Sequence, residues 1–216
     1  MIKTIIMAVV GMMFGWFVPL FAQKLIDYKG RQKKRSYPEN PLYQGLICKI
    51  ICAVISAVGY GVCGYMNPSW VLLVLVGIIW ILGMITIIVD LRIRIIANEV
   101  ILALLGLSII FRIVLGGFGS LLNSLLTMIV VMIGCIILGK IMGLWKVGAG
   151  DVKLFGVIGF LYGYPDVCAP ALLMAATLLA YCVIGLKTYR ITMKTMFAMA
   201  PFLVAGMLLG LTYIFR

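Results

Sequence analysis

The stretch Gly148-Ala149-Gly150-Asp151-Val152-Lys153 places an aspartate among glycines and a lysine, directly after a long apolar run. The chain has only six acidic residues in 216, so a carboxylate beside an apolar run is rare in this sequence. Asp90 is the other acid in a comparable position, at the end of an earlier apolar run. The two aspartates can form one site only if the fold brings Asp90 and Asp151 together.

The composition is that of a protein embedded in a membrane. The chain is 65% hydrophobic and 11% charged, with a mean hydropathy of +1.23, whereas soluble domains are about 25% charged. The apolar runs are continuous, while a transmembrane barrel needs short segments of alternating polarity. We therefore predict an all-α, polytopic membrane bundle of about eight transmembrane helices, with residues 1–216 forming a single domain.

Charged residues, glycines and prolines divide the chain into eight apolar runs. We predict spans over about residues 2–22, 42–65, 69–89, 100–115, 120–144, 151–162, 169–186 and 196–215. The sixth run is too short for an untilted crossing at 1.5 Å per residue. It must be partly re-entrant, extend beyond these bounds, or lie where protein and water replace lipid.

The basic residues predict the orientation of the bundle. A net charge of +12 would indicate nucleic-acid binding in a soluble protein, but here it fits the excess of Lys and Arg in cytoplasmic loops. We predict that residues 23–41 form a short basic cytoplasmic loop, with a secondary role in contacting anionic lipid head groups. Strict alternation then places 14 of the 18 Lys and Arg in cytoplasmic connections and both termini on the other side. No nucleic-acid partner is expected.

Asp90 and Asp151 are predicted to lie at the same face of the membrane, because the chain crosses it twice between them. Two carboxylates within hydrogen-bonding distance share a proton. One then acts as a general base on a water molecule, and the other protonates the leaving amine. This is aspartyl peptide hydrolysis, which needs no histidine, serine or metal. The chain has no histidine, which disfavours a serine triad and a zinc protease.

The residues around Asp151 have more than one interpretation. Gly148 and Gly150 lack a Cβ atom, so backbone or substrate can approach the aspartate closely. Lys153 is either an anchor at the membrane interface or an electrostatic element near the site. Asp151 itself fits the N-cap of the following helix, a role that is compatible with catalysis.

Asp90 also has a simpler interpretation, as an interfacial residue paired with Arg92 or Arg94. Both aspartates fit a cation site or a transporter gate as well, since acids within membranes often mark ion paths. If the pair does share a proton, we expect it mainly on Asp90, at a helix C-terminus, with Asp151 as the base at a helix N-terminus.

Three stretches resemble motifs of the type IV prepilin peptidases, which are GxGD-type intramembrane aspartyl proteases. Gly148–Lys153 is similar to the Gly-x-Gly-Asp-x-Lys motif of this family. Asp90-Leu91-Arg92, followed by Ala97-Asn98, looks like its first aspartate motif, although the family usually has proline where Ala97 stands. Pro201-Phe202 is similar to part of a Pro-Phe-Gly-Pro-Phe stretch in the last span.

The resemblance implies a membrane endopeptidase that removes the short basic leader of prepilins or pseudopilins at the cytoplasmic face of the bacterial cell membrane. It implies Asp90 and Asp151 as the catalytic pair, supported by Gly148, Gly150 and Lys153, without a metal or a cofactor for proteolysis. Many members also methylate the new N-terminus with S-adenosylmethionine. The loop at residues 23–41 is short and lacks the paired Cys-x-x-Cys motifs of members with a zinc-stabilised domain, so methylation here stays open. The alternative is a non-enzymatic transporter or assembly subunit.

Overall fold

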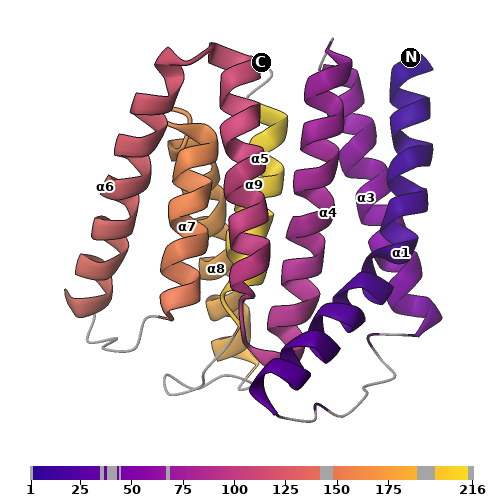
Figure 1. Ribbon diagram of the computed structural model, residues 1–216. Helices are drawn as coiled ribbons and strands as arrows, with labels where there is room; N and C mark the ends of the chain where they lie inside the picture. Colours follow the sequence, from indigo (N-terminus) through magenta and orange to yellow (C-terminus); the bar gives the residue numbers. More distant parts are fainter. Residues whose placement is uncertain are drawn as a thin grey trace.

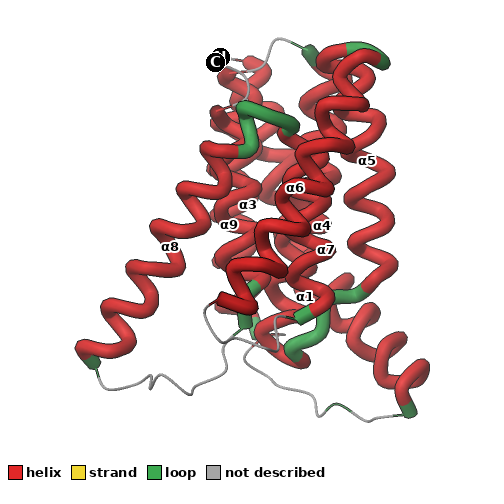
Figure 2. Tube along the Cα trace, turned by 90° about the vertical axis from the view of Figure 1, so that its left-hand side faces the viewer, coloured by secondary structure: helices red, strands yellow, loops and turns green. Residues whose placement is uncertain are grey.

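The computed structural model describes residues 2–34, 37, 43, 45–66, 69–141, 148–188 and 198–213. Six helices are long and apolar enough to cross a membrane, and two further helices have 14 residues each. The helices in this part of the chain are α1 (Ile2–Lys33), α3 (Leu46–Met66), α4 (Trp70–Ile93), α5 (Asn98–Gly116), α6 (Gly119–Ile141), α7 (Ala149–Tyr162), α8 (Cys168–Lys187) and α9 (Ala200–Tyr213). The prediction of an all-α polytopic membrane bundle is confirmed (Figures 1 and 2).

The first helix is longer than its apolar run. We predicted a span ending near residue 22 and a loop from 23 to 41, but α1 continues to Lys33. Residues 23–33 contain good helix formers and no proline, and Ile26 and Lys29 are buried against the bundle. The prediction of a loop is therefore wrong for residues 23–33, while residues 38–42 lie outside the described part. α1 bends on its way down (Figure 1), and it contains Pro19, which removes a helical hydrogen bond.

Small residues bring α1 and α3 together. A Cβ atom added to Gly11 would lie 2.6 Å from the main-chain oxygen of Ser56, and one added to Gly15 would lie 2.6 Å from that of Cys52. Such distances are too short for any real side chain, so the two glycines permit the close approach of the helices.

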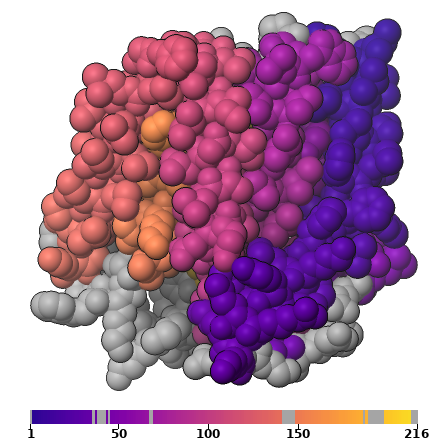
Figure 3. Space-filling model, viewed as in Figure 1, coloured from indigo at the N-terminus to yellow at the C-terminus, as the bar shows by residue number. Residues whose placement is uncertain are grey.

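α7 lies inside the bundle rather than against lipid. Its residues are buried from Leu154 to Tyr162, apart from the half-buried Phe155, by packing against α5, α6 and α9. On the face shown in Figure 3, α7 appears only between α5 and α6. Of the three explanations for a short sixth span, the structure therefore supports the one in which protein replaces lipid.

The two ends of the bundle differ in charge. α1 begins and α9 ends at one end, and the connection from α4 to α5 and the start of α7 lie at the other (Figure 1). The second end, here called the basic end, carries most of the described cations: Lys24, Lys29, Arg31, Lys33, Lys34, Arg92, Arg94, Lys140, Lys153 and Lys187. Both candidate aspartates belong to the basic end.

Candidate active site

Asp90 lies in the last turn of α4 and is held by another helix. We expected α4 to end just before it, but α4 continues to Ile93 and ends at Arg94, which has a left-handed backbone. Asp90 is 5% exposed. Its Oδ2 accepts a hydrogen bond of 3.0 Å from the main-chain N–H of Ala200, the first residue of α9. The first aspartate motif and the start of the last helix are therefore joined directly.

Asp151 lies in the first turn of α7, but it is not the N-cap. Gly148 is the N-cap, with extended backbone angles of φ −60° and ψ 125°. The Asp151 carboxylate folds back over this glycine, since a Cβ atom on Gly148 would lie 2.5 Å from Asp151 Oδ2. The interpretation of Asp151 as a capping residue is wrong. Gly148 makes room for the aspartate's own carboxylate.

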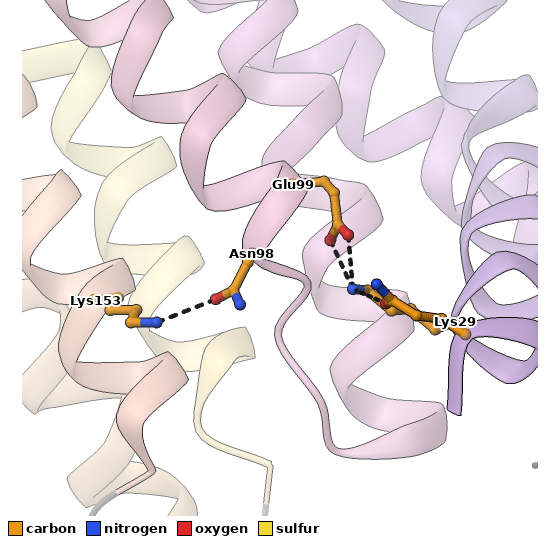
Figure 4. Close-up of polar contacts among 5 residues, drawn as sticks. Lys29, Asn98, Glu99 and Lys153 are labelled. Carbon is orange, nitrogen blue, oxygen red and sulfur yellow. Dashed lines mark hydrogen bonds and ion pairs between the residues drawn. The ribbon is translucent and has the colours of Figure 1, made fainter. Parts of the chain in front are cut away.

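Gly150 and Lys153 belong to the stretch Gly148–Lys153 and contact the segment that follows Asp90. A Cβ atom on Gly150 would lie 3.1 Å from the Cβ atom of Ile96, so the absence of a side chain lets α7 approach this connection. Lys153 Nζ donates a hydrogen bond of 3.3 Å to Asn98 Oδ1 at the start of α5 (Figure 4). Lys153 is exposed, so this bond is weak, yet it gives the lysine a partner in the first motif.

These contacts bring the two aspartate segments together at the basic end. The topological argument from an even number of crossings thus leads to two segments in contact. A catalytic role for the two aspartates stays a prediction, because the arrangement also fits an ion site.

Two contacts of the site could not be inferred from side-chain patterns. The donor to Asp90 is a main-chain N–H, which every residue except proline has. The residue type at position 200 therefore does not indicate this hydrogen bond. The second is the ion pair of Lys29 Nζ with Glu99 Oε2, at 2.8 Å. Glu99 follows Asn98 directly. Figure 4 shows the side chain of Asn98 directed toward Lys153 and that of Glu99 directed toward Lys29. The sequence predicts a loop at Lys29, so it gives no reason to expect this pairing.

The electrostatic premise about the shared proton also changes. We expected Asp90 to be unfavourable for a negative charge because it lies near the C-terminus of α4. Its carboxylate, however, accepts the first N–H of α9, and the N-terminus of a helix stabilises an anion. The premise that only Asp151 benefits from a helix N-terminus is therefore wrong.

Fold and site together define an integral membrane protein with two carboxylate-bearing segments in contact at one end of a helical bundle. The family model described as the type IV leader peptidase family matches residues 75–186. The match covers more than half of the chain and includes both aspartates, so the chain belongs to the type IV leader peptidase family, a family of peptidases. The resemblance stated from the motifs is thereby confirmed. Comparisons with curated proteins and with solved structures give no match.

Proposed function

We propose that this protein is an aspartyl endopeptidase that removes the basic leader from type IV prepilins or pseudopilins. Asp90 and Asp151 are the catalytic pair, and they act at the cytoplasmic face of a bacterial cell membrane. The orientation rests on the basic end, because Lys and Arg concentrate on the cytoplasmic side of membrane proteins.

One observation carries the proposal. The matched residues 75–186 contain both aspartates, and the segments that hold them meet through Gly150, Ile96, Asn98 and Lys153. A transporter gate would also bring acids together, but it gives no reason for membership of a peptidase family.

The proposed chemistry uses the different surroundings of the two carboxylates. Asp90, held by the N–H of Ala200, carries the negative charge, and Asp151 carries the proton. A water molecule attacks the carbonyl carbon of the scissile amide and gives a proton to Asp90, while Asp151 polarises the carbonyl oxygen. The proton held by the pair then passes to the amide nitrogen, the C–N bond breaks, and the leader leaves with a free carboxyl group. No cofactor takes part in this reaction.

The test is cleavage of a prepilin in a cell that lacks its own leader peptidase. We expect the chain to shorten a co-expressed prepilin by the length of its leader, seen as a shift on a gel and as the mass of the mature N-terminus. Asp90→Asn and Asp151→Asn should each abolish the shift. Asp166→Asn is the matched control, because Asp166 lies in the turn after α7, at the end of that helix away from the site, and it should process normally.

Processing by both Asp90→Asn and Asp151→Asn at the wild-type rate would refute the proposal and favour an ion-binding or structural role. The same mass measurement, made with S-adenosylmethionine present, also detects methylation. A mature N-terminus heavier by one methyl group would add that activity to the peptidase, and an unmodified one would restrict the protein to proteolysis.

A further inference from the structure

The last third of α1 is docked on the segment that follows Asp90. We call residues 23–33 the strap. Arg92 Nη1 donates a hydrogen bond to Gln23 Oε1 at the beginning of the strap. Further along, Lys29 Nζ lies 2.8 Å from both carboxylate oxygens of Glu99. The two contacts lie on either side of the connection between α4 and α5, which contains Ile96 and thus touches α7.

Lys29 is the main anchor of the strap. It is 6% exposed, although a lysine is almost never buried unless it is paired. Its ammonium group contacts Glu99 and also donates a hydrogen bond of 2.9 Å to Gln32 Oε1, so its charge and its donors are used. The other cations of this part of α1, Lys24, Arg31 and Lys33, are exposed, and so is Lys34 directly after the helix. Burial and pairing therefore distinguish Lys29 from a general positive charge at the membrane surface.

Glu99 is well placed to receive this cation. It lies in the first turn of α5, where the helix dipole favours a carboxylate. Its neighbour Asn98 accepts the hydrogen bond from Lys153. A displacement of this turn would therefore move the partner of α7 at the same time (Figure 4).

We infer that the strap is a positioning element of the active site, with Lys29 and Glu99 as positioning residues. The inference rests on the proposed function, and it adds a chain segment that lies outside the matched residues 75–186. By holding both sides of the connection after Asp90, the strap fixes the separation of Asp90 from Asp151. The contacts of the strap are with Arg92 and Glu99, so it acts on the reaction through the geometry of this connection.

The experiment compares kcat and KM for purified variants acting on a synthetic prepilin. Lys29→Met and Glu99→Gln should each lower kcat about tenfold or more, because small displacements of catalytic groups have effects of this size. KM should change by less than about twofold, since no substrate contact is lost. Lys33→Met is the matched control on the exposed face of the same helix, and it should keep the wild-type kcat.

The double variant Lys29→Met with Glu99→Gln decides whether the two residues act as a pair. A loss in kcat no larger than that of either single variant supports the inference, because the contact can be lost only once. Additive losses, or a wild-type kcat in Lys29→Met, would overturn it.

The shift in unfolding temperature in detergent gives the same comparison without a substrate. Non-additive shifts show the docked pair even if the chain cleaves no prepilin, and additive shifts refute the docking. Failure of the proposed function and failure of the strap are thus separately visible.

Discussion

The main-chain N–H of Ala200 lies 3.0 Å from Oδ2 of Asp90 and donates a hydrogen bond to it. The two residues are 110 positions apart in the chain, and both are buried. Asp90 therefore belongs to the last turn of α4 and also contacts the first turn of α9. Its carboxylate is the acceptor at the beginning of α9, where a negative charge is stabilised.

Removing this donor should shift the pH dependence of cleavage. Ala200→Pro deletes the N–H at the first position of α9, where proline is otherwise well tolerated in helices. A hydrogen bond to a charged group is worth about 1.5–3 kcal/mol, so the anionic form of Asp90 would be lost at a higher pH. The acid limb of the kcat/KM profile should move up by about one pH unit or more.

Ala200→Ser retains the N–H and is the control, with an expected profile close to that of the wild type. An unchanged acid limb in a folded, active Ala200→Pro protein would show that Ala200 does not hold the charge of the catalytic base.

Gly148 is needed for space rather than for backbone freedom. Its φ of −60° and ψ of 125° are accessible to every residue, but an alanine Cβ atom would lie 2.5 Å from Asp151 Oδ2. Gly148→Ala should therefore displace the carboxylate and lower kcat about tenfold or more, with little change in the unfolding temperature.

Gly106→Ala is the matched control for this substitution, because, apart from its chain neighbours and the backbone of its own helix, no described atom lies within 4 Å of the Cβ position at Gly106. Alanine there should leave kcat unchanged and stabilise α5 by up to about 1 kcal/mol through helix propensity. Equal kcat values for the two variants would contradict the steric role of Gly148.

Ala97 is a position at which the backbone already has the shape of proline. Its φ is −71°, within the range that the proline ring imposes, and the preceding residue is outside a helix, as proline requires. Ala97→Pro should therefore keep the wild-type kcat and stabilise the fold by roughly 0.4–1 kcal/mol, measured as a shift in the unfolding midpoint.

A proline in the interior of α5, Ala103→Pro, is the contrasting variant and should cost about 3 kcal/mol or more. If Ala97→Pro were comparably destabilising, the turn after Asp90 would have to differ from the one described.

Hydropathy alone was sufficient to predict a helical membrane bundle, because long apolar runs are local features of the sequence. The rarity of acids also singled out Asp90 and Asp151, whose catalytic role stays a prediction. The extension of α1 to Lys33 was missed for a physical reason. Residues 23–33 are mostly polar, so hydropathy marks them as solvated. Ile26 and Lys29 are nevertheless buried, and Lys29 meets Glu99 of α5 only in the folded chain.

The details of the site were missed for a related reason. The sequence predicts Asp151 as the N-cap because aspartate favours that position, but the glycine three residues earlier has this role and accommodates the carboxylate. A residue type describes what a side chain prefers. It does not reveal which main-chain N–H of a distant helix will bind that side chain, as the N–H of Ala200 binds Asp90.

Arg112 should affect stability without affecting the reaction. It is 7% exposed, and its Nη1 donates a hydrogen bond of 2.8 Å to the main-chain oxygen of Tyr162, the last residue of α7. Arg112→Met leaves this carbonyl without its charged donor and should lower the free energy of unfolding by roughly 1–3 kcal/mol. The kcat of the folded fraction should be unchanged, because Asp151 lies at the opposite end of α7.

Asn123→Ala provides the comparison for Arg112→Met. It removes an exposed hydrogen bond of 2.7 Å to the main-chain oxygen of Tyr164, in the turn that follows α7. Water replaces an exposed partner readily, so the loss of stability should be smaller than for Arg112→Met. A large fall in kcat for Arg112→Met, with little loss of stability, would mean that the far end of α7 controls the position of Asp151. The site would then depend on both ends of this short helix.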